Sequence, residues 1–260
     1  MHYLYAITDL CVQPQTLPPG IAGVPPEILP FDKFSAVAAR LPRAPAGDVA
    51  TARLHMSVLD ALMAEEAGAV LPARFGTTFS GREDLEQALN SRQDALLADL
   101  RRLRGQIELG VSVADRREQN SQAESKTQAV PFIKEATEGP GAHYIARKYA
   151  ENELRLQRGQ VVEQLAAKIC AEDSPLVALA GATSWRAQTQ SDASAISAAF
   201  LLPRERLAAF LAALDDMRLA EPELDFLCTG PWPPFSFVSV GVSPSSGKSA
   251  HVDTAHNVLA

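Results

Sequence analysis

The first part of the chain alternates short apolar runs with longer stretches of helical periodicity. Residues 3–7 and residues 34–41 are apolar runs that predict two strands. Residues 14–30 lie between them and are rich in proline and glycine, which predicts a loop. A helix is expected over about residues 49–67, because apolar side chains recur there at every fourth position: Leu54, Val58 and Leu62.

A second helix is expected to follow a broken strand. Residues 69–79 are extended in pattern, but Pro72 and Gly76 both interrupt a strand ladder, so an edge or bulged strand is predicted. Ser80 and Glu83 then have the spacing of a capping box. One helix ending near Gly105 is predicted from a single apolar stripe: Leu85, Leu89, Leu96, Leu100 and Leu103.

The second part of the chain has a strand and helix order that predicts one sheet covered by helices. The expected elements are a strand at 107–113, a long helix at about 141–172, extended pieces within 176–188, a strand at 195–202, a helix after Pro203 and a strand at 224–228. This order is βαββαβ, the ferredoxin-like split βαβ arrangement. Right-handed crossovers would place both helices on one face of a four-stranded antiparallel sheet.

The length of 260 residues favours two domains. The predicted fold class is α+β, with an N-terminal α+β domain at 1–105 and a ferredoxin-like domain with a long helical extension at 106–230. Residues 231–260 are expected to form a C-terminal strap and a flexible tail that closes the molecule.

Composition and charge exclude several classes of protein. Hydrophobic residues make up 47% of the chain and charged residues 21%, which is ordinary for a globular protein. The net charge of −7 makes nucleic acid a poor default partner. No apolar run is long enough to span a membrane, and the N-terminal residues lack the pattern of a signal peptide. Cys11, Cys170 and Cys228 are far apart, so we expect reduced thiols in a cytoplasm, with neither disulfides nor a zinc site.

The sequence carries no motif of catalysis or cofactor binding. The chain has five histidines, none of them part of a signature with a known mechanism. The short glycine turns at 76–78 and 139–141 match no phosphate-binding loop. We therefore expect no enzymatic activity, no metal and no cofactor, while a catalytic site assembled from distant residues stays open as an alternative.

The stretch from Thr229 to Val238, TGPWPPFSFV, is the least ordinary in the chain. Three prolines around Trp232 stiffen it in an extended form with few hydrogen-bond donors. One interpretation is a rigid strap that packs across the protein's own two domains. The other is a polyproline-like docking edge for a partner. The strap is favoured, because it explains the Trp and Phe side chains without an exposed apolar patch.

Five blocks of sequence, in order along the chain, together resemble the gas vesicle protein F/L family. They are YLYAI at 3–7, VLPARFGTTF at 70–79, GVSV at 110–113, GAHYIARK at 141–148 and GPWPPFSF at 230–237. Ser112 and Ala114 stand where the family often has Lys and Trp, and Phe235 stands where Tyr is common. Each block is weak alone, but the ordered set covers nearly the whole chain.

The resemblance implies a minor structural or assembly protein of gas vesicles, located in the gas vesicle and the cytoplasm. It implies two α+β domains, the second a modified ferredoxin-like fold with extra helices, packed together by a C-terminal tail. It also implies contact with the small hydrophobic shell protein and other gas vesicle accessory proteins. A ferredoxin-like regulatory or small-molecule-binding module is the alternative function. The candidate interaction or domain-seam residues lie in the blocks just quoted: Arg74, Phe75, Phe79, Tyr144, Arg147, Trp232 and Phe235.

Overall fold

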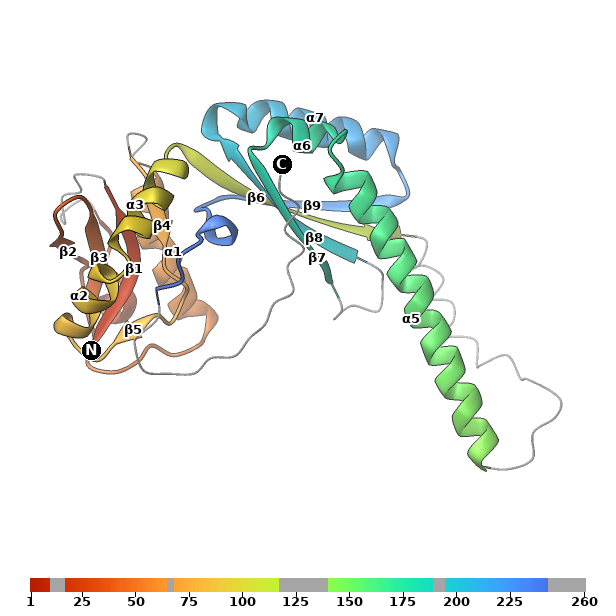
Figure 1. Cartoon of the computed structure of the whole chain (residues 1–260), viewed down its shortest axis with the longest axis horizontal. Coiled ribbons are helices and arrows are strands. Elements are labelled where there is room, and N and C mark those ends of the chain that lie inside the picture. Colours follow the sequence, from red (N-terminus) through yellow and green to blue (C-terminus); the bar gives the residue numbers. More distant parts are fainter. Residues whose placement is uncertain (10–16, 65–67, 117–139, 189–194, 243–260) are drawn as a thin grey trace. The chain divides into compact units, whose positions relative to one another are not determined.

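The computed structural model describes residues 1–9, 17–64, 68–116, 140–188 and 195–242. In these residues the fold is a mixed arrangement of helices and two sheets (Figure 1). By internal contacts the chain divides into two compact units. The first takes in Met1–Leu109, Leu201–Arg204 and the chain from Gly230, and the second takes in Gly110–Phe200 and Glu205–Thr229. The predicted domain limits at residues 105 and 230 stay a prediction.

The first sheet has the strand order β2-β3-β1-β4, with β5 also paired to β1. The central strand β1 (His2–Thr8) runs antiparallel to β3 (Ser35–Arg40), and the register shifts at a bulge between Leu4 and Ala6. On its other side β1 pairs with β4 (Val70–Pro72) and with β5 (Thr78–Phe79). The two strands and the broken strand predicted for this region are present.

The loop predicted for residues 14–30 is wrong at its end. Residues 27–30 form the edge strand β2 (Glu27–Pro30), which pairs with β3, and a short 3₁₀ turn occupies Ile21–Gly23. Proline lacks an N–H donor, but an edge strand needs only half of its backbone groups for pairing. The proline content therefore concealed a strand that lies at the margin of the sheet.

Three helices accompany the first sheet, one more than predicted. The first is α1 (Val49–Met63), whose N-terminus is capped by Asp48, and the others are α2 (Arg82–Asn90) and α3 (Gln93–Arg102). The single helix expected here is broken because Arg92, with φ −124° and ψ 14°, leaves the helical region. The five predicted leucines are nevertheless all buried. The predicted capping box is also wrong: Ser80 donates from its N–H and hydroxyl to the carboxylate of Asp84, each at 3.1 Å.

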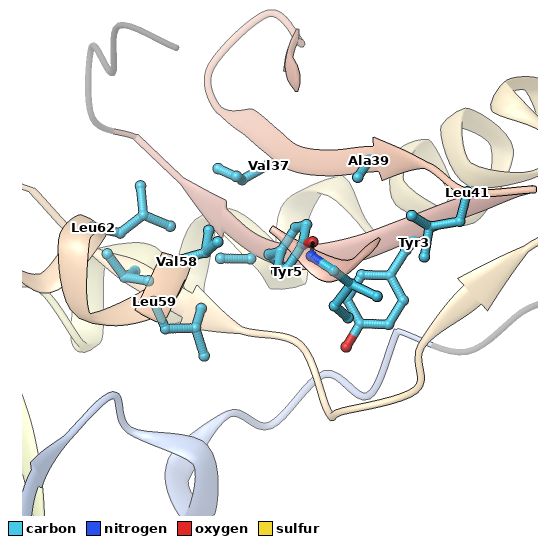
Figure 2. Packing of buried hydrophobic residues seen from close by; sticks show 11 residues of the cluster. Tyr3, Tyr5, Val37, Ala39, Leu41, Val58, Leu59 and Leu62 are labelled. Atoms are coloured by element: carbon cyan, nitrogen blue, oxygen red, sulfur yellow. Dashed lines mark hydrogen bonds between the residues drawn. The ribbon is translucent and has the colours of Figure 1, made fainter. Parts of the chain in front are cut away.

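The core of the first unit lies between the sheet and α1. Figure 2 shows Tyr3 and Tyr5 of β1 gathered with the aliphatic side chains of the neighbouring strand and helix. The labelled members are Tyr3, Tyr5, Val37, Ala39, Leu41, Val58, Leu59 and Leu62. We call this set, together with Ala6, Ile21 and Val70, the aromatic core cluster. The apolar runs of β1 and β3 meet Val58 and Leu62 of the predicted α1 stripe here, whereas Leu54, the third residue of that stripe, is 38% exposed.

The second sheet has the strand order β7-β8-β6-β9. Its strands are β6 (Gln106–Asp115), β7 (Ala182–Gln188), β8 (Ala195–Pro203) and β9 (Leu224–Trp232). Every predicted strand is present, although β9 continues past the expected end at residue 228 to include Trp232. Ile107, Leu109, Val111 and Val113 alternate along β6 and are all buried, which confirms that this strand has one buried face.

Helices α5 (Pro140–Cys170) and α7 (Leu207–Ala220) occupy the two predicted helical positions. An additional short helix, α6 (Pro175–Leu179), replaces the extended conformation expected there and contacts both α5 and α7 (Figure 1). On α5, Leu165 and Ile169 are buried near its end, whereas Tyr149 is 73% exposed and Leu156 59% exposed. Among the α5 side chains that the structure describes, the apolar pattern thus meets a core in the last part of the helix. No helix of the described ranges has the length and hydropathy needed to cross a membrane.

Candidate interaction surfaces

Residues 74–77, which we call the RFGT turn, join β4 to β5 and carry two of the candidate residues. The turn is closed by Thr77, which donates to the Arg74 carbonyl from its N–H at 3.1 Å and from its hydroxyl at 2.7 Å. Gly76 has φ +89°, a left-handed conformation that side chains disfavour. The Thr77 carbonyl also accepts the N–H of Leu4 in β1 at 3.0 Å. The sequence therefore fixes the turn locally and ties it to the central strand.

A buried pair of side chains supports the RFGT turn from beneath. The N–H of Gly76 donates to the Tyr3 hydroxyl at 3.2 Å, and that hydroxyl lies 2.8 Å from Nδ1 of His55 on α1. In the tautomer of neutral His55 that carries its proton on Nε2, Nδ1 accepts the proton of the Tyr3 hydroxyl. Nε2 is buried near the backbone carbonyl of Ala73, but no hydrogen bond of ordinary length and angle joins the two groups.

The electrostatics of this pair follow from burial. His55 is 1% exposed, and loss of solvation lowers its pKa to about 4. Burial likewise raises the pKa of Tyr3. His55 also stacks on Tyr5, with ring centroids 5.6 Å apart. At neutral pH both groups are therefore uncharged, and the pair works as a rigid support rather than as an acid or a base. Nothing near His55 in the sequence marks Tyr3 as its partner, because the two residues lie 52 positions apart.

The RFGT turn presents a cation beside an aromatic ring. Phe75 is 38% exposed, and its ring meets His55 edge-on with centroids 5.8 Å apart. The exposed Arg74 side chain has no ion pair within the described part of the chain. Phe79, by contrast, is 1% exposed and belongs to the interior, so it is not available to a partner. Of the three candidates in this block, the structure leaves two on the surface.

The proline-rich stretch ends in a segment that is held at four points in the first unit, and we call residues 233–240 the strap. Phe235 packs against the aromatic core cluster.

Hydrogen bonds hold the rest of the strap. Ser236 donates from its N–H and its hydroxyl to the two carboxylate oxygens of Glu108, each at 2.7 Å. Ser239 donates in the same two ways to Asp99, at 2.8 Å each. Arg102 donates to the Phe237 carbonyl. Trp232 precedes the strap and is 37% exposed.

The two carboxylates that hold the strap were not candidates from the sequence. Glu108 stands on the polar alternation of β6 and Asp99 on α3, both of which predict solvent exposure, yet they are 8% and 2% exposed. Burial alone would raise the pKa of Asp99, but hydrogen bonds from Arg102 and Ser239 and the Arg102 charge outweigh it and lower the pKa. In the sequence these two acids resemble ordinary surface acids. Their hydrogen bonds to the distant residues Ser236 and Ser239 show that they hold the fold together.

The remaining candidates Tyr144 and Arg147 belong to α5, and their side chains lie outside the described residues. Across the described ranges, no three His, Cys, Asp or Glu side chains are grouped as a metal site would need. The structure thus places the Phe75 ring against His55, with the exposed Arg74 next to it in the chain, and places Phe235 on the cluster that contains Tyr3.

Comparison with known proteins assigns the chain to a family. A family profile described as gas vesicle synthesis protein GvpL/GvpF matches residues 1–239. Gas vesicle protein F of a Streptomyces species is 29% identical over 228 residues, covering 86% of this chain and 94% of that protein. Gas vesicle protein L of the same organism is 27% identical over 264 residues, covering 92% and 93%.

Crystal structures show the same fold. Gas vesicle protein GvpF from an Anabaena species superimposes with a TM-score of 0.70 at 18% identity, covering 96% of this chain and 98% of that one. GvpF from Microcystis aeruginosa gives a TM-score of 0.67 at 20% identity, covering 92% and 99%. With the family profile spanning all but the end of the sequence, the chain belongs to the GvpL/GvpF family of gas vesicle synthesis proteins.

Proposed function

We propose that this chain is a minor structural or assembly protein of gas vesicles that binds the small hydrophobic shell protein and other accessory proteins while the vesicle forms. The observation that carries the proposal is the RFGT turn, where an exposed Arg74 and a partly exposed Phe75 stand on a buried support. Arginine and aromatic side chains are enriched among the residues that dominate protein interfaces. The proposed role is a non-catalytic one.

The rigidity of the turn favours binding. A loop that is already ordered loses little conformational entropy when a partner docks, so more of the contact energy appears as affinity. The Tyr3 hydroxyl holds the Gly76 N–H, and the Phe75 ring rests against His55. A shell protein with large apolar surfaces is prone to aggregate before assembly. A protein that covers part of such a surface through an aromatic anchor would delay aggregation and guide ordered growth.

The test is a binding assay with the purified shell protein and full-length variants. Arg74→Ala and Phe75→Ala should each weaken capture about tenfold, as expected for the loss of an interface anchor. Arg101→Ala is the matched control, because Arg101 is also an exposed arginine of the first unit but lies on α3. Circular dichroism and thermal unfolding establish that each variant is folded. Unchanged capture by folded Arg74→Ala and Phe75→Ala proteins would reject the RFGT turn as the docking site.

We also propose a ferredoxin-like arrangement for the second part of the chain. The order β7-β8-β6-β9 places the first strand of the βαββαβ series beside the third and the fourth. This is the neighbour relation that two crossovers on one face of a sheet produce. The division into residues 1–105, 106–230 and 231–260 belongs to the same proposal. Native-state hydrogen exchange followed by mass spectrometry would test it, since residues within each of these parts should open together as one cooperative unit.

The proposed location is the gas vesicle and the surrounding cytoplasm. A deletion strain that lacks vesicles would show that the protein is needed for assembly. Mass spectrometry of washed vesicles would then establish whether the protein is part of the finished particle. Normal vesicle number and shape in the deletion strain would contradict the assembly role.

A further inference from the structure

The surface under the strap, which we call the strap groove, is built to be occupied. It consists of Glu108 on β6, Asp99 and Arg102 on α3, and the part of the aromatic core cluster against which Phe235 packs. Both carboxylates are buried, and each accepts the N–H and the hydroxyl of one serine. Buried carboxylates that lose such donors are strongly disfavoured.

The groove therefore selects its occupant by chemistry. An occupant must bring two serines three positions apart, each free to donate from both its backbone and its hydroxyl, with an aromatic side chain just before the first. Ser236, Ser239 and Phe235 meet this requirement. A segment without hydroxyls at these two positions would leave carboxylate oxygens unsatisfied, and an acidic segment would place like charges beside Glu108 or Asp99.

The strap is attached in a way that permits it to leave without unfolding a sheet. It lies beyond the last strand, β9, and contains only the single turn Phe235–Phe237. Three of the four residues from 231 to 234 are prolines, which lack N–H donors and stiffen the chain where β9 ends and the strap begins. Gly230, with φ +114°, directly precedes this proline-rich segment, and a Cβ there would lie 2.8 Å from the Glu108 carbonyl oxygen. The strap thus follows a stiff proline-rich segment and is held by separate contacts of Phe235, Ser236 and Ser239.

We propose that the strap groove also accepts the strap of a second copy of this chain, so that two copies bind each other by exchanging residues 233–240. The groove binds the strap within one chain, and a second copy carries an identical strap. An exchanged strap would form the same contacts as the internal one. Such an exchange requires no new interface, because the contacts of the monomer become contacts between copies. This inference goes beyond the proposed function and does not depend on the partner that docks at the RFGT turn.

The test uses two full-length variants that are each defective in a different half of the contact. The groove variant carries Glu108→Gln and Asp99→Asn and keeps an intact strap. The strap variant carries Phe235→Ala, Ser236→Ala and Ser239→Ala and keeps an intact groove. Light scattering and native mass spectrometry measure association of each variant alone and of an equal mixture. The matched control is a protein with all five substitutions mixed with the groove variant.

Exchange predicts that the mixture forms a one-to-one dimer, because the straps of the groove variant fit the grooves of the strap variant. Its dissociation constant should be at least about tenfold lower than that of either variant alone or of the control mixture, given the loss of charge-assisted hydrogen bonds in those cases. A labelled peptide of residues 231–242 should bind the strap variant and not the protein with five substitutions. Association of the mixture no stronger than that of the control overturns the proposal. Peptide binding without association of the mixture also overturns it, since the arm then cannot reach a second copy.

Discussion

The carboxylate of Asp99 should hold the strap more strongly than the hydroxyl of Ser239 does. Asp99 is 2% exposed and accepts the Ser239 N–H at 2.8 Å, the Ser239 hydroxyl at 2.8 and 2.9 Å, and the Val240 N–H at 3.3 Å. It also accepts from Arg102 at 2.7 Å. Asp99→Asn keeps the size of the side chain but replaces one accepting oxygen with an NH₂ group that can only donate.

The size of the effect follows from the bonds that are lost. A hydrogen bond to a charged group contributes about 1.5 to 3 kcal/mol and a neutral one about 0.5 to 1.5 kcal/mol. Asp99→Asn weakens every bond by removing the charge and abolishes those to one oxygen, so closing of the strap should become less favourable by about 2 to 3 kcal/mol. Ser239→Ala removes only the hydroxyl donor and leaves the N–H bond, so it should cost about 1 kcal/mol.

Hydrogen exchange at single amides measures strap opening directly. A loss of about 2 kcal/mol should speed exchange of the Ser239 and Val240 amides about 30-fold in Asp99→Asn. The Ala73 amide, which donates to the Tyr5 carbonyl at 2.8 Å within the first sheet, serves as the internal control and should not change. Exchange at Ser239 that is less than about threefold faster in Asp99→Asn would refute the reasoning, because it would mean that the charge contributes under about 1 kcal/mol.

The pH dependence of the strap has a definite sign. Although burial opposes it, hydrogen bonding and the Arg102 charge lower the pKa of Asp99 in the folded protein. The unfolded value is about 3.9, so the stabilisation is present above that pH and is lost as the pH falls through the lower folded value. Protection of the Ser239 amide should therefore fall in acid in the wild type. Asp99→Asn should lack this part of the acid dependence.

Three further outcomes follow from the structure. The pKa of His55 is lowered to about 4 in the folded protein, against about 6.5 in the unfolded chain. The unfolding free energy should therefore fall by about 2 kcal/mol between pH 7 and pH 5, because only the unfolded chain takes up the proton. Denaturation of His55→Phe should not show this loss. Gly20→Ala should destabilise by about 1 to 3 kcal/mol, because its Cβ would lie 2.2 Å from the Tyr5 hydroxyl, while Gly47→Ala, with nothing within 4 Å, should unfold like the wild type. Arg116→Ala removes an exposed ion pair to β9 and should leave the denaturation midpoint within error of the wild type, because solvent screens the pair; a clear shift of the midpoint would contradict the exposed setting.

The helical break between α2 and α3 shows the limit of pattern reasoning in this chain. Leu85 and Leu100 are both buried as predicted, because a turn between the two helices keeps their apolar stripes toward the same core. Periodicity reports which side faces inward and is insensitive to an interruption of two residues. Ser80 likewise has the acid partner that a helix start requires, but the partner is Asp84 and not Glu83. The choice between neighbouring acids is made by the backbone direction, which the spacing leaves open.

The sequence by itself determined the inward positions of β6 and the order of the strands and main helices of the second sheet. Ile107 and Val113 are buried as their alternation predicts, because burial of an apolar face depends on local period and needs no knowledge of its partner. Only the tertiary structure decided that Glu108 is buried, since its bond to Ser236 joins residues 128 positions apart. The same holds for His55, whose partner Tyr3 lies 52 positions away. A polar side chain is stable inside only when a specific donor or acceptor meets it, and that meeting is settled by the assembled fold.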